Sequence, residues 1–250
     1  RFPRKLSWPR SKWKTEDMGK TLAGQSQRRG KGGAKKRRRW YGSTAIVAGV
    51  VLLAVALRFF VVQGIRVPSR SMEDTLLAGD CLLFDKMTYG ALVPWLDWRL
   101  PGFRPPRVGE LLVFKYPIDP ERSYVKRCLA VAGQMVEIRD KAVYVDGARQ
   151  SDPPFSKYVD ARIFPSAVAR RDNFGPSEVP AGSIFVVGDN RDNSRDSRHW
   201  GFLPLELLLG RPLCVYWSVA PEVLDGGSGS QSMGSFIGRI RWNRLGTCVQ

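Results

Sequence analysis

Two serines separated by one residue, Ser69 and Ser71, are the first candidates for chemistry in this chain. Pro68 fixes its own φ angle and favours extended backbone just before it, so the chain enters the pair as an extended segment. In extended backbone, residues i and i+2 point to the same side, so we expect both hydroxyls on one face. A serine hydroxyl becomes an effective nucleophile only beside a base. Taken alone, such a pair is more often part of a turn.

Two side chains are candidates for that base. His199 is the only histidine, and it lies beside Trp200 at the end of a charged turn, where packing is the more usual role. Lys126 lies within the apolar segment 124–131, which we predict to be a strand. Burial would remove the solvation of its ammonium group and lower its pKa, which supplies a neutral amine. Without further evidence, a lysine at such a position is more often at the surface.

An apolar run precedes the serines. Residues 45–57 are uninterrupted apolar, and after Arg58 the run resumes and ends at Ile65. These 21 residues, at about 1.5 Å each, match a hydrocarbon core of roughly 30 Å, so we predict a transmembrane helix over 42–65. The alternatives are a buried soluble helix and a signal peptide cleaved after residues 54–56. Against cleavage, some 40 residues precede the apolar core and hydrophobicity continues beyond the cut.

The net charge of +17 is concentrated in an N-terminal arm. Residues 1–40 hold 15 Lys and Arg against two acidic residues, a balance of +13 that leaves +4 for the remainder. A basic arm before an apolar run indicates orientation in a membrane, which disfavours a nucleic-acid role. We therefore expect residues 1–41 to be a disordered cytoplasmic tail, with everything after Ile65 outside.

Beyond residue 65 the pattern is that of short strands, which predicts a mainly β fold of antiparallel sheets. Strands are expected at 81–86, 111–114, 124–131, 183–187 and 213–219, with a hairpin of 135–138 and 142–145. The domains expected from this pattern are a catalytic core of 66–146 and 181–220, a small inserted region of 147–180, and a linker with a basic-aromatic terminal segment over 221–250.

Two features stay open at this level. The aromatic loop 88–106 fits either a membrane-surface contact or packing onto the core. The four cysteines lack metal-ligand spacing, and the sequence does not decide whether any two pair: Cys81, Cys128, Cys214 and Cys248.

Four motifs carry a family resemblance. They are, in order, Pro68-Ser69-x-Ser71-Met72, Arg107-x-Gly109 followed by an acid, Lys126-Arg127, and Gly188-Asp189-Asn190-Arg191-x-x-Ser194-x-Asp196-Ser197-Arg198. Together they resemble the type I signal peptidases, the membrane-anchored Ser/Lys serine proteases of bacteria, over roughly residues 45–220. The sequence departs from the family pattern at Asp74 in place of proline, at Glu110 in place of aspartate, and at 132–134 in place of Pro-Gly-Asp.

The resemblance implies a role for each motif residue. Ser71 would be the nucleophile and Lys126 the general base, a known variant of serine-protease chemistry. Ser69, with the Ser71 backbone N–H, would form the oxyanion hole. Ser194 would orient the lysine amine. Asp196 and Arg198 would pair and hold the site in shape, and Asp189 would support it.

The resemblance also implies the function of a signal peptidase I, which removes N-terminal signal peptides from exported precursors through an acyl-enzyme. It implies that the precursor has small side chains at positions −1 and −3 of the cleavage site. It implies no cofactor and no metal, and its partners would be precursor proteins and the lipid bilayer, without nucleic acid. The chain would be single-pass in the inner membrane, with its catalytic part on the periplasmic face. Two alternatives remain: a self-cleaving repressor-type Ser-Lys protease, and a membrane-tethered module without catalysis.

Overall fold

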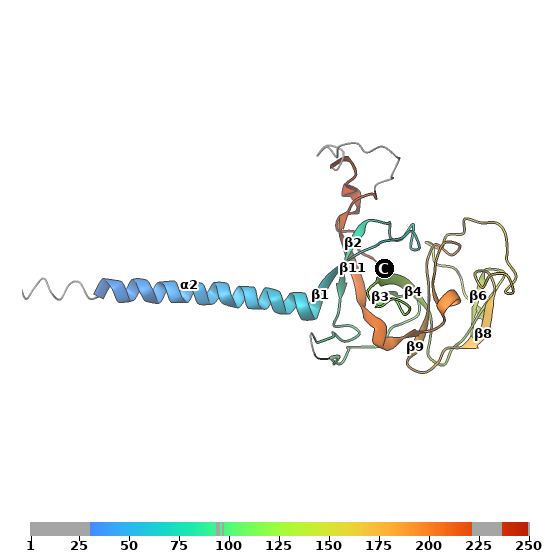
Figure 1. The fold of residues 1–250 in the computed structure, drawn as a ribbon, viewed down its shortest axis with the longest axis horizontal. Helices are drawn as coiled ribbons and strands as arrows, with labels where there is room; N and C mark the ends of the chain where they lie inside the picture. Colours follow the sequence, from blue (N-terminus) through green and yellow to red (C-terminus); the bar gives the residue numbers. More distant parts are fainter. Residues whose placement is uncertain (1–30, 94–95, 97, 222–236, 250) are drawn as a thin grey trace, which may run out of the picture. The chain divides into compact units, whose positions relative to one another are not determined.

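The computed structural model describes residues 31–93, 96, 98–221 and 237–249 (Figure 1). The chain divides into two compact units, residues 1–55 and 56–250. The elements, in order, are helix α2 (Lys31–Ala56), the π-helix η1 (Leu57–Val61), β1 (Val62–Arg66), β2 (Asp80–Asp85), β3 (Leu111–Lys115), β4 (Ser123–Val131), β5 (Met135–Arg139), β6 (Ala142–Val145), β7 (Ala148–Arg149), β8 (Phe174–Glu178), β9 (Ser183–Val187), α3 (Ser197–Trp200), β10 (Leu203–Pro204), the short helix η2 (Leu205–Leu207), β11 (Leu208–Ser218) and η3 (Trp242–Arg244).

The N-terminal helix differs from the sequence prediction at both ends. Helix α2 begins at Lys31, so residues 31–41 are helical rather than disordered; residues 1–30 lie outside the described part. The predicted helix over 42–65 is wrong for its last four residues, because residues 62–66 form β1 and pair with β2. Pairing with an otherwise unpaired sheet edge outweighs continuation of the helix there. Among the helices that the structure describes, none is both long and apolar enough to cross a membrane.

The main sheet has seven strands in the order β1-β2-β11-β3-β4-β9-β10 (Figure 1). Every pairing between neighbouring strands is antiparallel. The mainly β, antiparallel fold expected from the sequence is thus confirmed. Strand β3 lies near the middle of the order, and four of its five residues are buried. Such burial requires apolar side chains on both faces, which Leu111–Phe114 provides.

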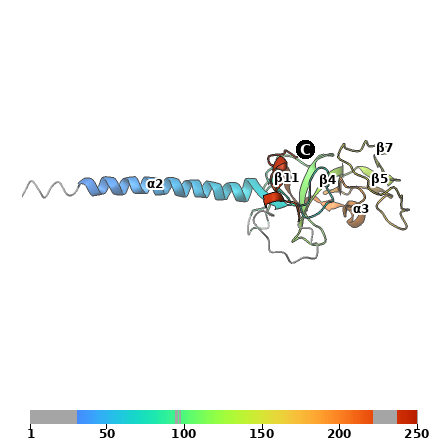
Figure 2. The same cartoon turned by 90° about the horizontal axis from the view of Figure 1, so that it is seen from above.

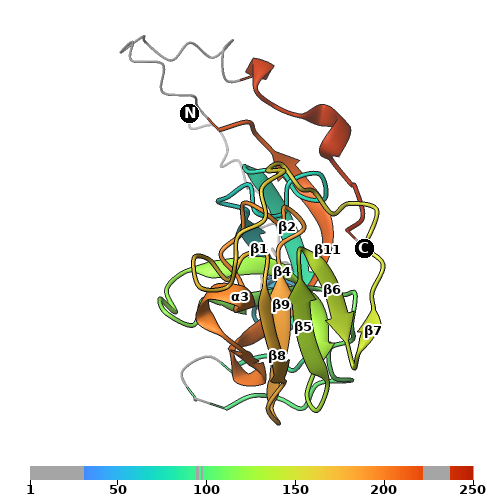
Figure 3. The ribbon, with the colours of Figure 1, turned by 90° about the vertical axis from the view of Figure 1, so that its right-hand side faces the viewer.

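The second sheet has four strands in the order β7-β6-β5-β8 (Figure 3). The predicted hairpin of β5 and β6 is confirmed, with Val136 opposite Val145 and Arg139 opposite Ala142. The small sheet therefore begins at Met135, earlier than the predicted insertion of 147–180. Its buried valines pack with Phe185 of β9, so the two sheets share one apolar cluster. When the view is turned, β11 and β4 lie on one side of the second unit and β5 and β7 on the other (Figure 2).

The C-terminal segment, which we define as residues 237–249, packs against β11 and places one residue, Val249, in the core. Strand β11 begins five residues earlier than predicted, at Leu208. Residues of the segment form isolated antiparallel bridges with β11 and the residue after it: Cys214 with Cys248, and Val219 with Ile240. Val249 is buried in the same apolar cluster as Met72. Of the predicted linker and terminal segment over 221–250, residues 222–236 and 250 lie outside the described part.

Candidate active site

Ser71 lies in the turn between β1 and β2, and that turn is held at both ends. Val67 donates its N–H to the carbonyl of Asp80 at 2.8 Å, and Gly79 donates to the carbonyl of Val67 at 2.9 Å. Met72 and Leu76 are buried in the apolar core under the turn. Packing on one side and hydrogen bonds at the base therefore fix the position of the serine that follows Arg70.

The structure brings Ser69, Ser71 and Lys126 together as the motifs predict. Lys126 Nζ donates a hydrogen bond to Ser71 Oγ, and Ser69 Oγ lies 3.0 Å from Ser71 Oγ. Lys126 projects from β4, where its backbone is opposite Leu112 of β3, and only 2% of its surface is exposed. Ser71 itself is 7% exposed. A buried amine therefore contacts a nearly buried hydroxyl.

Burial lowers the pKa of Lys126 from its usual 10.5 to about 8. Loss of solvation around the ammonium is the main cause, and the Arg198 guanidinium acts in the same direction. The carboxylates of Asp196 and Asp189 oppose it and raise the pKa. An amine with a pKa near 8 is neutral in about a tenth of the molecules at pH 7 and in about half at pH 8, and the neutral form is the state that a general base needs.

Gly188 lies against Ser71 and Ser194. A Cβ at this position would meet Ser194 Oγ at 2.3 Å and the Ser71 carbonyl oxygen at 2.5 Å. Only a residue without a side chain allows this approach. Ser194 is buried, and its Oγ has no hydrogen-bond partner within the described part of the chain. The resemblance implies that Ser194 orients the Lys126 amine; within the described part of the chain the two side chains are not hydrogen-bonded.

Asp196 and Arg198 form the buried ion pair that the resemblance implies. Arg198 donates to both carboxylate oxygens, from Nε and Nη2, each at 2.8 Å. Burial would raise the pKa of Asp196, but the charge and hydrogen bonds of Arg198 outweigh it and hold that pKa at about 2. Asp196 also accepts a hydrogen bond from the Gly188 N–H at 3.1 Å and caps α3. The ionised pair thus fixes the backbone against which the site packs.

Asp189 connects three parts of the chain. Its carboxylate accepts two hydrogen bonds from Arg127, from Nε at 2.9 Å and Nη2 at 2.8 Å. It accepts a third from the Thr75 hydroxyl at 2.6 Å. Arg127 also donates to the carbonyl of Gly109 at 2.8 Å. In the sequence, Arg127 is distinguished only by its place in a motif. The structure shows that its guanidinium binds the Asp189 carboxylate and fixes it next to the turn that carries Ser71.

Through Lys157, the predicted insertion contacts the turn that carries Ser71. The N–H of Lys157 donates to the carbonyl of Asp189 at 2.8 Å, and its Nζ lies 3.4 Å from the Asp74 carboxylate and 3.6 Å from that of Glu73. Asp74 adopts a φ of 81°, which proline cannot reach because its ring fixes φ near −65°. The aspartate in place of the family's proline therefore changes the turn and adds an ion pair to it.

The C-terminal segment supports the same turn from the other side. Arg244 Nη2 donates to Asp80 Oδ2 at 2.6 Å and to the Thr75 carbonyl at 3.1 Å. Arg241 Nη1 donates to the Ala78 carbonyl at 3.1 Å. The side chain of Asp80 is fully buried. Sequence reasoning missed these contacts because the two arginines lie outside every motif and nothing local to them indicates their partner.

His199 is not placed to act as the base. Its side chain is 41% exposed, and Nδ1 lies 4.0 Å from Asp196. Burial lowers the pKa of His199, and Asp196 partly offsets this. No hydrogen bond within the described residues joins His199 to Ser71.

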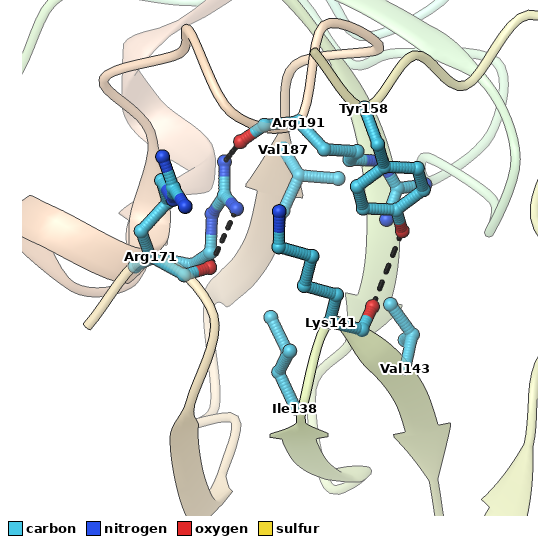
Figure 4. Close-up of a pocket in the computed structure, with 8 residues that line it drawn as sticks. Ile138, Lys141, Val143, Tyr158, Arg171, Val187 and Arg191 are labelled. Atoms are coloured by element: carbon cyan, nitrogen blue, oxygen red, sulfur yellow. Dashed lines mark hydrogen bonds between the residues drawn. The ribbon is translucent and has the colours of Figure 1, made fainter. Parts of the chain in front are cut away.

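A small cavity lies between the second sheet and the motif that contains Arg198 (Figure 4). Its volume is about 10 Å³, room for roughly one water molecule. Its lining is Ile138, Lys141, Val143, Tyr158, Arg171, Val187, Arg191 and Arg198. The Arg198 guanidinium donates to the carbonyls of Arg171 and Arg191 at 2.8 and 2.7 Å. The cavity therefore belongs to the polar network that joins the sheets rather than to a substrate site.

Comparison with known proteins decides the family. The model of the family "Signal peptidase, peptidase S26" matches residues 38–217, which include every motif residue described above. The chain belongs to this family. Its relatives include signal peptidase I of Pseudomonas fluorescens, 31% identical over 203 residues that cover 69% of this chain and 70% of that protein. Probable signal peptidase I-1 of Synechocystis is 36% identical over 170 residues, covering 65% of this chain and 75% of the relative.

Among solved structures, the crystal structure of a signal peptidase I from Enterococcus faecalis V583 matches with a TM-score of 0.35 and 24% identity, over 43% of this chain and 97% of that chain. Membership of the signal peptidase family confirms the prediction from sequence of a serine endopeptidase of the signal peptidase I type.

Proposed function

We propose that this signal peptidase cleaves exported precursors with Ser71 as nucleophile and Lys126 as general base. One observation carries the proposal: the buried Lys126 Nζ is hydrogen-bonded to Ser71 Oγ, and burial lowers its pKa to about 8. Nucleophile and base are thus in contact before any substrate arrives, which is the arrangement that activates a serine.

The reaction proceeds through an acyl-enzyme. Neutral Lys126 takes the proton of Ser71 as Oγ attacks the carbonyl carbon of the scissile peptide bond. The resulting ammonium donates that proton to the leaving amine, and the mature protein departs. Lys126, neutral again, then removes a proton from water, which attacks the carbonyl carbon of the ester on Ser71. The bond from that carbon to Ser71 Oγ breaks, the Lys126 ammonium returns the proton to Oγ, and the signal peptide is released with a free carboxyl group. No metal or cofactor enters any of these steps.

The oxyanion is stabilised by Ser69 and the backbone N–H of Ser71. Ser69 Oγ lies 3.0 Å from Ser71 Oγ, close enough for its hydroxyl to turn to an oxygen bound at the reacting carbon. The Ser71 N–H donates no hydrogen bond within the described residues, while the Ser71 carbonyl accepts one from the Asn190 N–H at 3.1 Å. That bond orients the peptide unit after Ser71.

The supporting residues keep these groups in place. Asp189 is held by Arg127, and Asp196 by Arg198. Ser194 is the proposed orienting group for the amine, because its buried hydroxyl has no partner in the described part and lies, like the Ser71 carbonyl, against Gly188. The substrate would lie extended beside the site and add backbone hydrogen bonds as a strand does.

Membrane attachment through the apolar N-terminal segment is part of the proposal. The described apolar side chains of α2 are largely exposed, with Ile46 at 70% and Leu52 at 69%. Apolar groups that cover a helix in this way are unstable in water and would be covered by lipid. Trp98 and Phe103 of the aromatic loop are also exposed and are proposed to contact the bilayer surface. With the basic arm in the cytoplasm, the catalytic unit lies on the periplasmic face of the inner membrane.

Protease added to intact spheroplasts tests this topology. It should digest the catalytic unit and spare the basic arm. A catalytic unit that is digested only after lysis would contradict the proposed orientation.

Cleavage of a precursor tests the function. Purified full-length chain in detergent, mixed with a precursor that carries a signal peptide, should release the signal peptide at one bond, identified by mass spectrometry. Ser71→Ala should abolish the cut, and Ser69→Ala should slow it about 10²–10³-fold. Cleavage of its own chain in preference to the precursor would favour a self-cleaving Ser-Lys protease instead. No cleavage of either would favour the binding module.

A further inference from the structure

We propose that Cys214 and Cys248 form a disulfide bond that fastens the C-terminal segment to strand β11. The four cysteines are free thiols in the structure. Two of them, one on β11 and one in the C-terminal segment, lie directly opposite each other in an antiparallel bridge. Their spacing in the sequence carries no indication of this pairing, and the strand register alone reveals it.

The hydrogen bonds around the pair define its geometry. Val215 donates its N–H to the Thr247 carbonyl at 3.0 Å, and Val249 donates to the Leu213 carbonyl at 2.9 Å. These bonds flank the two cysteines and do not join them, so the cysteines form a non-hydrogen-bonded pair. In such a pair the Cα atoms are about 4.5 Å apart and both side chains point to the same face. Disulfides span Cα separations of about 4.4–6.8 Å, so the bond can form without movement of the backbone.

Exposure and register favour this pair over the other cysteines. Cys248 is exposed and Cys214 partly exposed, so an oxidant can reach them. Cys128 is fully buried, and burial raises the pKa of its thiol to about 12, which suppresses the reactive thiolate. Cys81 lies opposite Trp217 of β11, and Cys214 lies opposite Leu83 of β2. Cys81 and Cys214 are therefore not opposite each other.

The bond forms by exchange with a small disulfide such as oxidised glutathione. The thiolate of one cysteine attacks the reagent, which gives a mixed disulfide and one glutathione thiol. The thiolate of the second cysteine then attacks the protein sulfur of that mixed disulfide and expels a second glutathione thiol. The protein loses two protons and two electrons, and the reagent's disulfide is reduced to two thiols.

The consequence reaches the nucleophile turn. The same C-terminal segment carries Arg244 and Arg241, whose side chains bond to Asp80, Thr75 and Ala78 after Ser71. A covalent link at Cys248, four residues beyond Arg244, restricts how far the arginine can withdraw. It also limits the freedom of the unfolded chain between the two cysteines, which raises the stability of the folded state.

Peptide mapping of the full-length chain in detergent tests the proposal, because trypsin places each cysteine on a separate peptide: 71–86, 128–139, 199–239 and 245–250. The chain is incubated with oxidised glutathione, free thiols are blocked, and the digest is analysed by mass spectrometry. We expect peptides 199–239 and 245–250 to be joined, with the loss of two hydrogen atoms, and to separate on reduction. A parallel sample oxidised in guanidinium shows which cysteines form disulfides when the chain is unfolded.

Matched variants and a thermal measurement complete the test. Cys81→Ser should leave the joined peptides unchanged, and Cys248→Ser should abolish them. The oxidised wild type should melt several degrees above the reduced wild type, whereas Cys248→Ser should show no such dependence on oxidation. The proposal is overturned if Cys214 joins Cys81 instead, or if the 214–248 link is no more abundant than in guanidinium. None of these readouts depends on peptidase activity, so the outcome is separate from that of the proposed function.

Discussion

Arg244 and Asp80 are 164 positions apart in the sequence and form an ion pair under the turn that carries the nucleophile. Asp80 is fully buried, and it also accepts hydrogen bonds from the Ser218 hydroxyl and the Leu77 N–H. Because Arg244 bonds the Thr75 carbonyl as well, the pair links the C-terminal segment to the position of Ser71. The C-terminal segment is thus part of the apparatus that positions the active site.

Replacement of this arginine should destabilise the protein and slow cleavage together. Arg244→Met leaves a buried carboxylate without its main partner, which typically costs about 3–5 kcal/mol of unfolding free energy. Arg122→Met is the matched control, because its ion pair with Asp119 is exposed and worth less than about 1 kcal/mol. Chemical denaturation and kcat measure the two effects. Equal losses in the two variants would contradict a structural role for the Arg244–Asp80 pair.

Gly188→Ala should impair catalysis through geometry. The added Cβ would press on Ser194 Oγ and on the Ser71 carbonyl, and a displacement of about 1 Å at a nucleophile can reduce rates by about 10²-fold. Gly238→Ala is the control, because a Cβ there meets nothing within 4 Å. Both variants are compared by kcat, with circular dichroism to monitor folding. Full activity of Gly188→Ala would show that the close packing around the serines has no functional importance.

His199→Ala should retain most of the activity. Its side chain is 41% exposed and has no hydrogen bond to Ser71 within the described residues, so we expect no proton transfer to depend on it. Loss of a general base typically lowers kcat by about 10²–10⁴-fold. A loss of that size in a correctly folded His199→Ala variant would transfer the role of base from Lys126 to His199.

The chemistry was more predictable from the sequence than the architecture that supports it. Ser71 and Lys126 could be predicted as partners because each stands in a short motif with a local pattern around it, and the structure brings the two side chains into contact. The end of the helix could not be predicted, because residues 62–65 follow an apolar run in the sequence. Only their pairing with β2 makes them a strand. The role of Arg244 was equally inaccessible, because its partner is set by the fold and not by neighbouring residues.

The buried lysine should lower the free energy of unfolding, fully below about pH 8 and less as the pH approaches 10.5. Folding lowers the pKa of Lys126 from 10.5 to about 8, so the unfolded chain binds its proton more tightly. The corresponding cost, up to about 3 kcal/mol at neutral pH, fades as pH rises from about 8 to 10.5.

Lys126→Met should therefore be more stable than the wild type at pH 7, with an advantage that shrinks toward pH 10.5. Denaturation curves at several pH values measure this, with Ser71→Ala as the variant that retains the lysine. A Lys126→Met variant less stable than the wild type at pH 7 would indicate that a charged lysine stabilises the fold.

The pH dependence of precursor cleavage tests the Ser71–Lys126 mechanism most directly. Single-turnover rates are measured for the wild type and Lys126→Met between about pH 6 and pH 10, over which a base near neutrality titrates. The wild-type rate should rise with pH with a midpoint near 8, as Lys126 loses its proton. Lys126→Met, which keeps the length of the side chain but lacks the amine, should be slower by at least about 10³-fold at every pH. Cleavage by Lys126→Met at more than about a few per cent of the wild-type rate would contradict the Ser71–Lys126 mechanism.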